Sequence, residues 1–166
     1  GRRAPVHLIR LIEDAVAMQR SGFEKRGVKI SRSYPPQTVL IDGDRTKLVR
    51  VFVNLLKNAL ESFDAVHEDE GESVEQSPAI GIAVECVDTP EGRRVRASVT
   101  DSAAGFDEVP PSLAGEERVT DKPGGSGMGL YAARRIVAAH GGALTLESPG
   151  AGHGATATVV LPVARE

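Results

Sequence analysis

Hydrophobic residues in the first quarter of the chain are spaced first as in a helix and then as in strands. Over residues 6–27 the apolar positions recur every three or four residues, and Gly27 is of the type that commonly ends a helix. The apolar positions of this face are Leu8, Leu11, Ile12, Ala15 and Val16. Residues 28–33 and 38–41 then have strand-like patterns on either side of a Pro-Pro pair. The pattern predicts one amphipathic helix followed by two short strands.

A long helix is predicted after Asp44, which can cap its N-terminus. It runs to about Phe63 or beyond, and at about 100° per residue its apolar side chains fall on one face. These side chains are Leu48, Phe52, Leu55, Leu56, Ala59 and Phe63. Asn54 and Asn58 lie almost opposite that face, one turn apart, so their side chains are neighbours. Because asparagine is unfavourable inside a helix, the pair has two interpretations: a solvated polar face, or two carbonyl oxygens presented to a hard cation such as Mg²⁺.

The middle of the chain predicts an acidic loop and then a β-hairpin. Residues 64–78 are rich in Asp and Glu and are interpreted as a solvated loop. Residues 79–87 and 93–100 have strand patterns, with turn residues over 88–92 between them. The two strands are therefore expected to pair as a hairpin.

Asp101 continues the apolar face of the second hairpin strand. Val95, Ala97 and Val99 share one face, so the Asp101 carboxylate is expected to point toward the core. A charge in that position requires a partner. Two interpretations remain open: the carboxylate caps a turn at the strand end, or it accepts a hydrogen bond from a buried ligand amine, such as the exocyclic amine of adenine.

The last third of the chain combines a long irregular segment, a helix and a second hairpin. Residues 107–123 contain three prolines and no clear period, and loops of that length in a compact domain are often lids or binding segments. Helical spacing returns over 128–140 and ends at a Gly-Gly pair, and residues 143–148 and 155–161 predict two strands. Strand pairs interleaved with helices favour one sheet with helices packed on one face.

Residues 124–130, Gly-Gly-Ser-Gly-Met-Gly-Leu, form a glycine cluster that leads directly into the predicted helix. Backbone N–H groups of such a loop can approach an anion, and the helix N-terminus adds a favourable dipole. The segment lacks the Lys-Ser/Thr pair of a Walker A loop and the preceding strand of a dinucleotide-binding motif. Taken alone, it fits a flexible linker as well as a phosphate-binding loop.

Composition narrows the class of protein. The 166 residues, 40% hydrophobic and 26% charged, fit a single globular domain over residues 1–166 with a core over 6–162. A net charge of −3 and a pI near 5.9 argue against nucleic acid as the main partner. The single cysteine, Cys86, fits a reducing compartment, and no apolar run approaches the ~20 residues that span a bilayer. Glycine is enriched, and 11 of the 18 glycines lie over residues 105–154.

The asparagine pair, the strand-end aspartate with a glycine four residues later, and the glycine cluster resemble, in this order, the N, G1 and G2 boxes of the GHKL ATPase superfamily. This superfamily comprises gyrase, the heat-shock chaperones of the 90-kDa class, histidine kinases and the MutL mismatch-repair proteins. Residues 54–59 and 122–130 are most similar to the boxes of the catalytic and ATP-binding domain of bacterial sensor histidine kinases. The resemblance covers residues 6–162. It implies an α/β (α+β) two-layer sandwich, the Bergerat ATP-binding fold, with a mixed sheet, helices on one face and an ATP lid over 107–123.

The resemblance also implies a role for each matching residue. Asn58 would ligate Mg²⁺ on the ATP phosphates, and Asn54 would assist. Asp101 would bind the adenine amine, and Gly105 would shape the base pocket. Gly125, Gly127 and Gly129 would wrap the phosphates, and Lys122, Met128 and Leu130 would also belong to the cofactor-binding residues. The chain's cofactors would thus be ATP and Mg²⁺.

The sequence departs from the family pattern at two positions. The first glycine of the G1 box is Ala103 here, and where the backbone requires a positive φ its methyl group costs on the order of 1 kcal/mol. Family members often carry a basic residue three positions after the second asparagine, where this chain has Glu61, so Lys57 or Lys122 would supply the cation. These departures leave open an alternative: a degenerate nucleotide-binding or pseudokinase module that regulates by docking onto a partner without phosphoryl transfer.

The branches of the superfamily differ at the position of Asn54. Its hydrolases and its anti-sigma serine kinases typically carry glutamate there as a general base, and a neutral amide is a poor base. A histidine acceptor is already nucleophilic, so a histidine kinase needs positioning and charge neutralisation more than proton abstraction. Asn54 therefore favours a histidine kinase over a stand-alone serine kinase or anti-sigma factor.

The phosphoacceptor histidine of the sensor kinases is not recognised in the chain. His7 lacks the acidic residue and the proline of that motif, and His67, His140 and His153 are expected to be structural or solvated. The resemblance thus implies a monomeric, cytoplasmic catalytic domain that transfers the γ-phosphate of Mg-ATP to a histidine on a separate dimerisation domain. A response regulator would act downstream, and neither nucleic acid nor membrane would contact this domain.

Overall fold

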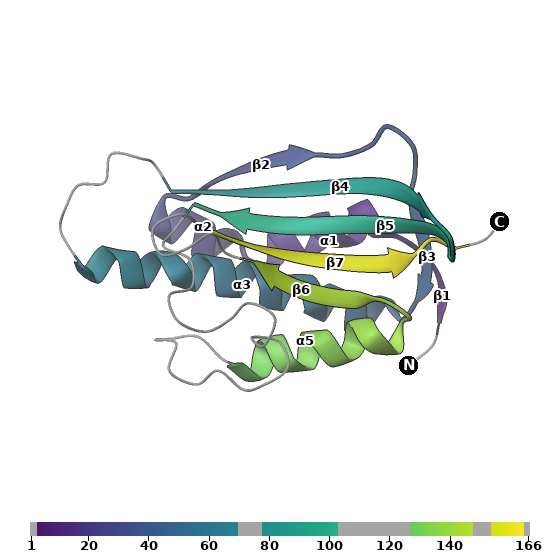
Figure 1. Cartoon of the computed structure of the whole chain (residues 1–166). Coiled ribbons are helices and arrows are strands. Elements are labelled where there is room, and N and C mark those ends of the chain that lie inside the picture. The colour runs from purple at the N-terminus through teal and green to yellow at the C-terminus, as the bar shows by residue number, and fades with distance from the viewer. Residues whose placement is uncertain (1–2, 70–77, 103–126, 148–153, 165–166) are drawn as a thin grey trace.

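Five strands form a mixed sheet, and two further strands form a small second sheet (Figure 1). The structure, a computed structural model, describes residues 3–69, 78–102, 127–147 and 154–164. Its helices and strands in chain order are β1 (Ala4–His7), α1 (Leu8–Met18), α2 (Arg20–Arg26), β2 (Lys29–Ser33), β3 (Leu40–Gly43), α3 (Arg45–Asp69), β4 (Ala79–Thr89), β5 (Gly92–Asp101), α5 (Gly127–Ala139), β6 (Ala143–Glu147) and β7 (Ala155–Pro162).

The larger sheet has the strand order β2-β4-β5-β7-β6, with β5 at its centre. β2 pairs parallel with β4, and all other neighbours pair antiparallel. Side chains along β5 alternate, so that Val95, Ala97 and Val99 are buried while Arg96 and Thr100 are exposed. One face of the central strand therefore belongs to the core, as its alternating sequence predicts.

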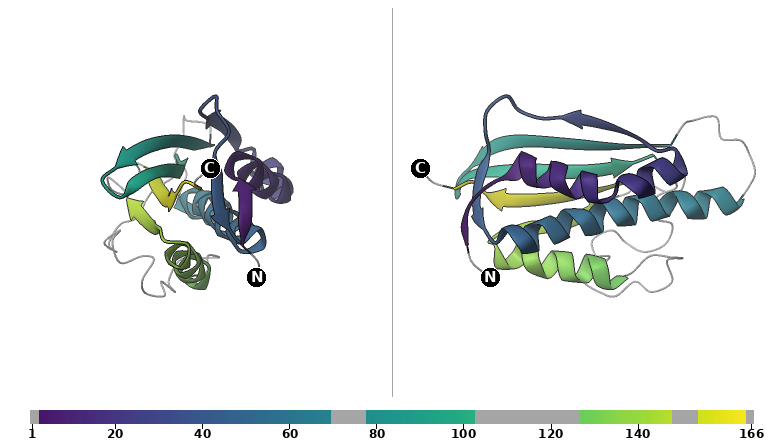
Figure 2. Two further views of the ribbon diagram at one scale, coloured as in Figure 1. Left: turned by 90° about the vertical axis from the view of Figure 1, so that its right-hand side faces the viewer. Right: turned by 180° about the vertical axis from the view of Figure 1, so that it is seen from behind.

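Helices α1, α3 and α5 cover one face of the five-stranded sheet (Figure 2). α3 packs against both α1 and α5. The small sheet pairs β1 antiparallel with β3, which leads directly into α3. A mixed sheet with helices on one face confirms the expected two-layer α/β (α+β) fold class.

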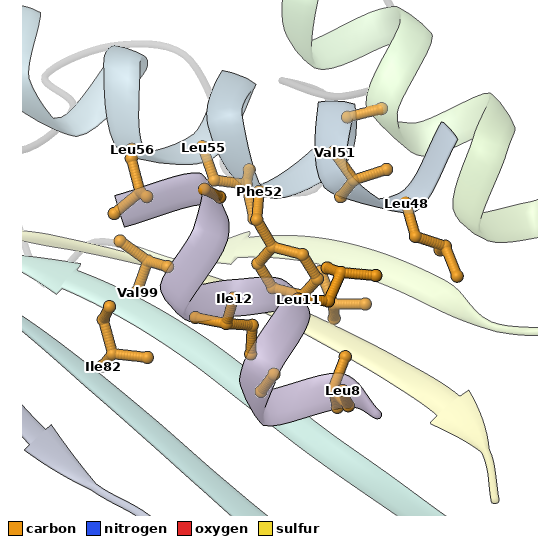
Figure 3. Packing of buried hydrophobic residues seen from close by; sticks show 14 of the residues in the cluster. Leu8, Leu11, Ile12, Leu48, Val51, Phe52, Leu55, Leu56, Ile82 and Val99 are labelled. Carbon is orange, nitrogen blue, oxygen red and sulfur yellow. The ribbon is translucent and has the colours of Figure 1, made fainter. Parts of the chain in front are cut away.

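The core lies between the helices and the sheet, with Phe52 of α3 at its centre (Figure 3). Phe52 is fully buried, and its ring points from α3 toward Leu11 of α1. On the sheet side, Ile82 of β4 and Val99 of β5 point toward the helices. The apolar face predicted for the long helix is confirmed for its buried members Leu48, Phe52, Leu55, Leu56 and Ala59, whereas Phe63 is only partly buried.

The segment 6–27 is not one helix, contrary to its periodicity. Its first residues belong to β1, where Val6 pairs with Ile41 of β3. The helical part is divided at Gln19 into α1 and α2. An apolar residue at position 6 fits both a strand and a first helical turn, so spacing alone could not separate them.

The acidic segment 64–78 is partly helical rather than wholly a loop. α3 extends into it as far as Asp69. The Arg26 guanidinium of α2 donates to both carboxylate oxygens of Asp64, at 3.0 and 2.9 Å. This two-point ion pair joins the beginning of the acidic segment to α2, an interaction that charge counting along the sequence does not show.

Both predicted hairpins are confirmed. β4 pairs with β5, and β6 pairs with β7, in antiparallel register. The helix predicted over 128–140 is α5, displaced by one residue at each end. The expected ATP lid, 107–123, lies outside the described residues.

Candidate functional site

Three of the sequence motifs are brought to one region of the molecule. β5 ends in Asp101 and α5 begins at Gly127 on the same side (Figure 1). α3 contacts both of these elements and carries Asn54 and Asn58. Residues more than 70 positions apart in the sequence, such as Asn54 and Gly129, are therefore neighbours in the fold.

Asn54 connects α3 directly to the first turn of α5. Its side-chain Nδ2 donates a hydrogen bond to the backbone carbonyl oxygen of Gly129, at 3.1 Å. Both Asn54 and Asn58 are half-buried. A purely solvated polar face, one of the two interpretations of this pair, does not fit these contacts. The asparagine pair instead lies where α3 faces the beginning of α5.

Replacing Asn54 with aspartate is expected to destabilise the ligand-free chain by about 1 kcal/mol at pH 7. A carboxylate cannot donate to the Gly129 carbonyl, and the change places two acceptors 3.1 Å apart. The free energy of unfolding should be measured in urea between pH 4 and pH 7. Below the pKa of the new carboxyl the protonated acid can donate, so the difference from wild type should narrow. An equal free energy of unfolding for both chains at pH 7 would mean that the bond contributes nothing.

Asp101 is buried at the end of the central strand, with 7% of its surface exposed. It pairs with Ile80 of β4 on one side and with Ala155 of β7 on the other. The expected orientation of its side chain toward the core is thus confirmed. Backbone pairing on both flanks thus fixes this end of the central strand.

The first turn of α5 supplies the backbone of the glycine cluster. Gly127, Met128, Gly129 and Leu130 all lie in this turn. The N–H groups of a first turn lack partners within the helix, and the helix dipole makes this end favourable for an anion. The Leu130 side chain is buried in the core, with 3% exposed, so only its backbone is available to a ligand.

His140, just after α5, links the C-terminal end of α5 to the N-terminal end of α3. The Asp44 backbone N–H donates to Nε2 of His140 at 3.0 Å, and Nδ1 lies 2.8 Å from the Ile136 carbonyl oxygen. These two contacts assign the proton of the neutral ring to Nδ1. Asp44 in turn caps α3 as predicted, because its Oδ1 accepts the Lys47 backbone N–H at 3.2 Å, which lowers the pKa of the Asp44 carboxyl.

A magnesium ion at this site would meet amide oxygens. The Nδ2 of Asn54 donates to the Gly129 carbonyl, so the Oδ1 of Asn54 is the atom of this amide that could face a cation. Asn58 adds a second side-chain amide one turn further along α3. In the part of the chain that the structure describes, no group of three or more His, Cys, Asp or Glu side chains is placed to hold a metal ion. Amide oxygens suit Mg²⁺, which takes most of its ligands from water and substrate phosphates. The donor set therefore fits a metal that arrives with phosphates.

Several of the predicted site residues are not placed together by the structure. Gly105, Lys122 and Gly125 lie outside the described residues, as does Ala103. Lys57 is described on α3, where its side chain is exposed. Glu61 is half-buried on the same helix, one turn before the Asp64 that pairs with Arg26.

Sequence reasoning missed Ser102 and Gly154, whereas the structural role expected for His140 agrees with its two hydrogen bonds. The Ser102 hydroxyl accepts the Ala79 backbone N–H at 3.0 Å, and the Ser102 N–H donates to the Ala79 carbonyl at 3.1 Å. Gly154 lies against the backbone of Asp101. The sequence did contain a signal for Gly154, because the strand predicted at 155–161 begins directly after it. The pairing of that strand with β5 could not be read from the sequence.

None of the helices in the described part of the chain is long and apolar enough to cross a membrane.

The sequence matches a protein family described as histidine kinase-, DNA gyrase B-, and HSP90-like ATPase over residues 43–165. It is 35% identical over 160 residues to the sensor protein FixL of Bradyrhizobium diazoefficiens, covering 96% of this chain and 29% of FixL. It is 30% identical over 152 residues to the sensory histidine kinase/phosphatase NtrB of Rhizobium meliloti, covering 88% of this chain and 38% of NtrB. The chain thus spans well under half of these curated relatives.

Solved structures share the fold. The mycobacterial sensor histidine kinase MprB superposes with a TM-score of 0.75 at 22% identity, covering 99% of this chain and 100% of that one. The nucleotide-free catalytic domain of histidine kinase ThkA gives a TM-score of 0.75 at 21% identity, with 98% and 96% covered. ThkA in complex with the response regulator TrrA gives 0.70 at 22% identity, with 98% and 42% covered.

Proposed function

Since the chain belongs to the family of histidine kinase-, DNA gyrase B- and HSP90-like ATPases, we propose that it is the catalytic and ATP-binding domain of a protein-histidine kinase. It binds Mg-ATP and transfers the γ-phosphate to a histidine on a separate dimerisation domain. The observation that carries this proposal is the hydrogen bond from Asn54 to Gly129, which joins the family's N box to its G2 box. The sensor kinases among its relatives support the choice of branch.

In this proposal the chain's residues bind and orient the nucleotide. The Asp101 carboxylate accepts the adenine amine, and the N–H groups at the beginning of α5, around Gly127 and Gly129, receive phosphate oxygens. Asn58, assisted by Asn54, contributes amide oxygens toward Mg²⁺, and the ion when bound neutralises charge on the phosphates. Gly105 and Gly125 complete the pocket, and Lys57 or Lys122 supplies a cation.

Phosphoryl transfer then needs little proton chemistry from this chain. The bond between the γ-phosphorus and the β,γ-bridging oxygen breaks, a bond from that phosphorus to an acceptor imidazole nitrogen forms, and ADP leaves with the bridging oxygen. An imidazole nitrogen with a lone pair attacks without a base, so the neutral amide of Asn54 is sufficient. The absence of a base at position 54 also disfavours transfer to water, and slow ATP hydrolysis is expected.

A second candidate function rests on Ala103, which replaces a glycine of the G1 box, and on Glu61, which replaces a basic residue of the family pattern. A nucleotide-binding module that docks onto a partner without transferring phosphate would tolerate both. This module would bind nucleotide through the same residues, so only a transfer assay separates it from the kinase.

The test is Mg-ATP titration of the purified chain by calorimetry, followed by incubation with a histidine-bearing dimerisation domain from the same full-length protein. The kinase proposal expects saturable Mg-ATP binding and an acid-labile, base-stable phosphate on the acceptor histidine. A response regulator added next should receive the phosphate, as the complex of ThkA with a response regulator suggests for the pathway. Binding without transfer would favour the docking module, and ATP turnover as fast as that of a dedicated ATPase would contradict the role given to Asn54.

A further inference from the structure

Gly154 lies immediately before β7 and is buried against the last residue of the central strand. Its φ is +82°, in the left-handed region that favours glycine. A methyl group on Gly154 would lie 2.3 Å from the backbone oxygen of Asp101 and 3.4 Å from its carbonyl carbon. Both atoms belong to the main chain, so a side chain here cannot be accommodated by rotating a neighbour. The backbone of Asp101 or of Gly154 would have to move.

Asp101 is held on its other flank as well. Ser102, the next residue, exchanges two hydrogen bonds with Ala79 at the beginning of β4: its N–H donates to the Ala79 carbonyl at 3.1 Å, and its hydroxyl accepts the Ala79 N–H at 3.0 Å. Asp101 itself pairs with Ile80. The end of β5 therefore lies between the beginning of β4 and Gly154, and a side chain at Gly154 would collide with it.

We infer that Gly154 and Ser102 form a backbone clamp that sets the position of the Asp101 carboxylate and thereby the selectivity of the site for adenine. The inference rests on the proposed function, in which this carboxylate accepts the exocyclic amine of adenine. Neither clamp residue contacts the nucleotide in this proposal. They are positioning residues that act through Asp101.

The clamp affects selectivity because a hydrogen bond is steeply dependent on geometry. Adenine presents an amine to the carboxylate, whereas hypoxanthine in ITP presents a carbonyl oxygen at the same place, which a carboxylate repels. A buried and fixed carboxylate discriminates well, since the wrong base places an acceptor oxygen against its negative charge. A displaced carboxylate loses the amine contact and part of the repulsion together, so that the affinities for ATP and ITP approach each other.

The experiment compares Gly154→Ala with Gly141→Ala by titrating each chain with Mg-ATP and Mg-ITP. Gly141 is a matched control because its φ is +81° and a methyl group there would meet only the Pro162 side chain, 3.4 Å from its Cγ. Both variants carry the same backbone strain, but only Gly154→Ala collides with Asp101. Wild type and Gly141→Ala are expected to bind ATP about tenfold or more tighter than ITP, and Gly154→Ala is expected to lose most of that ratio.

A second pair of variants keeps the test decisive if Gly154→Ala fails to fold. Ser102→Ala removes the exposed hydroxyl that receives the Ala79 N–H, just after β5, and Ser98→Ala removes a hydroxyl within β5, four residues earlier. The ATP-to-ITP ratio should fall about threefold in Ser102→Ala and stay at the wild-type value in Ser98→Ala.

The outcomes separate the clamp from the proposed function. If wild type binds ATP and ITP equally, the role of Asp101 is wrong and the proposed adenine site fails. If wild type binds ATP more tightly than ITP and Asp101→Asn does not, the proposed adenine site stands. An ATP-to-ITP affinity ratio that is unchanged in folded Gly154→Ala then overturns the clamp alone. If Gly154→Ala does not fold, an unchanged ratio in Ser102→Ala has the same meaning.

Discussion

Replacement of Asn58 by alanine is expected to remove most of the Mg²⁺-dependent affinity for ATP while leaving the fold intact. Asn58 lies one turn beyond Asn54 on α3, half-buried, and Asn54 contacts the first turn of α5. Its amide oxygen is the ligand that the resemblance to the sensor kinases assigns to the metal. Interactions with charged groups contribute about 1.5–3 kcal/mol, so the loss should be roughly 10- to 150-fold in affinity.

The measurement is ATP titration by calorimetry in Mg²⁺ and again in EDTA. For wild type the two affinities should differ strongly, and for Asn58→Ala they should converge. Asn58→Asp is the matched control, because it retains an oxygen at the same place and should retain the dependence on Mg²⁺. Alanine has a higher helix propensity than asparagine, so a loss of helix stability cannot account for the effect. Full Mg²⁺ dependence in Asn58→Ala would rule out this residue as the ligand.

Phe52→Ala is expected to lower the free energy of unfolding by about 3–5 kcal/mol, the largest stability effect proposed for this chain. The Phe52 ring is fully buried between α3 and α1 and lies over the sheet (Figure 3). Alanine there removes the transfer free energy of the ring and leaves a cavity that the close-packed core around it fills only in part. Unfolding in urea should show a lower midpoint with an unchanged m-value.

Phe63→Ala provides the control for that prediction. It is the same substitution on the same helix, at a residue that is only partly buried. Its cost should be clearly smaller, because less apolar surface leaves water there on folding. Whole domains are stable by only about 5–15 kcal/mol, so Phe52→Ala could fail to fold. In that case Phe52→Leu, which keeps much of the side-chain volume, replaces it in the comparison. Equal losses at both positions would mean that Phe52 is not the centre of the core.

Elements whose local signals agree were predictable from the sequence. For α3, the cap at Asp44 and the helical spacing from Leu48 onward indicate the same beginning and the same buried face. For β5, strict alternation placed Asp101 on the core side before any pairing was known. In both cases the periodicity of apolar residues predicts which face is buried. This prediction does not require knowing which strand or helix packs against that face.

Elements that depend on a distant partner were not predictable. β1 exists because Val6 pairs with Ile41, and nothing within four residues distinguishes that strand from a helical turn. α3 continues past Asp64, where the pattern indicates a solvated loop, and Arg26 of α2 binds that carboxylate across the helical layer. Tertiary contacts of this kind override local preference without leaving a local signal.

In the candidate site, too, the sequence predicted the features with a local signal and not the contacts between distant residues. The sequence identified Asn54, Asp101 and the glycine cluster as chemically special, because asparagines in a helix and a carboxylate on an apolar strand face need an explanation. It did not show that Asn54 donates to Gly129, 75 residues away, or that Gly154 abuts Asp101. Such contacts are properties of the folded arrangement, and they decide how the motifs act together.

The bond between His140 and the Asp44 backbone fastens one end of the α3–α5 pair, so any pivoting of α5 about this contact would act over the length of the helix. From His140 to Gly129 the helix axis measures about 16 Å at 1.5 Å per residue. A rotation of about 3° at the pivot therefore moves Gly129 by about 1 Å relative to α3, which is enough to break its 3.1 Å bond to Asn54. Small angular changes there become displacements the size of a hydrogen bond where phosphates are proposed to bind.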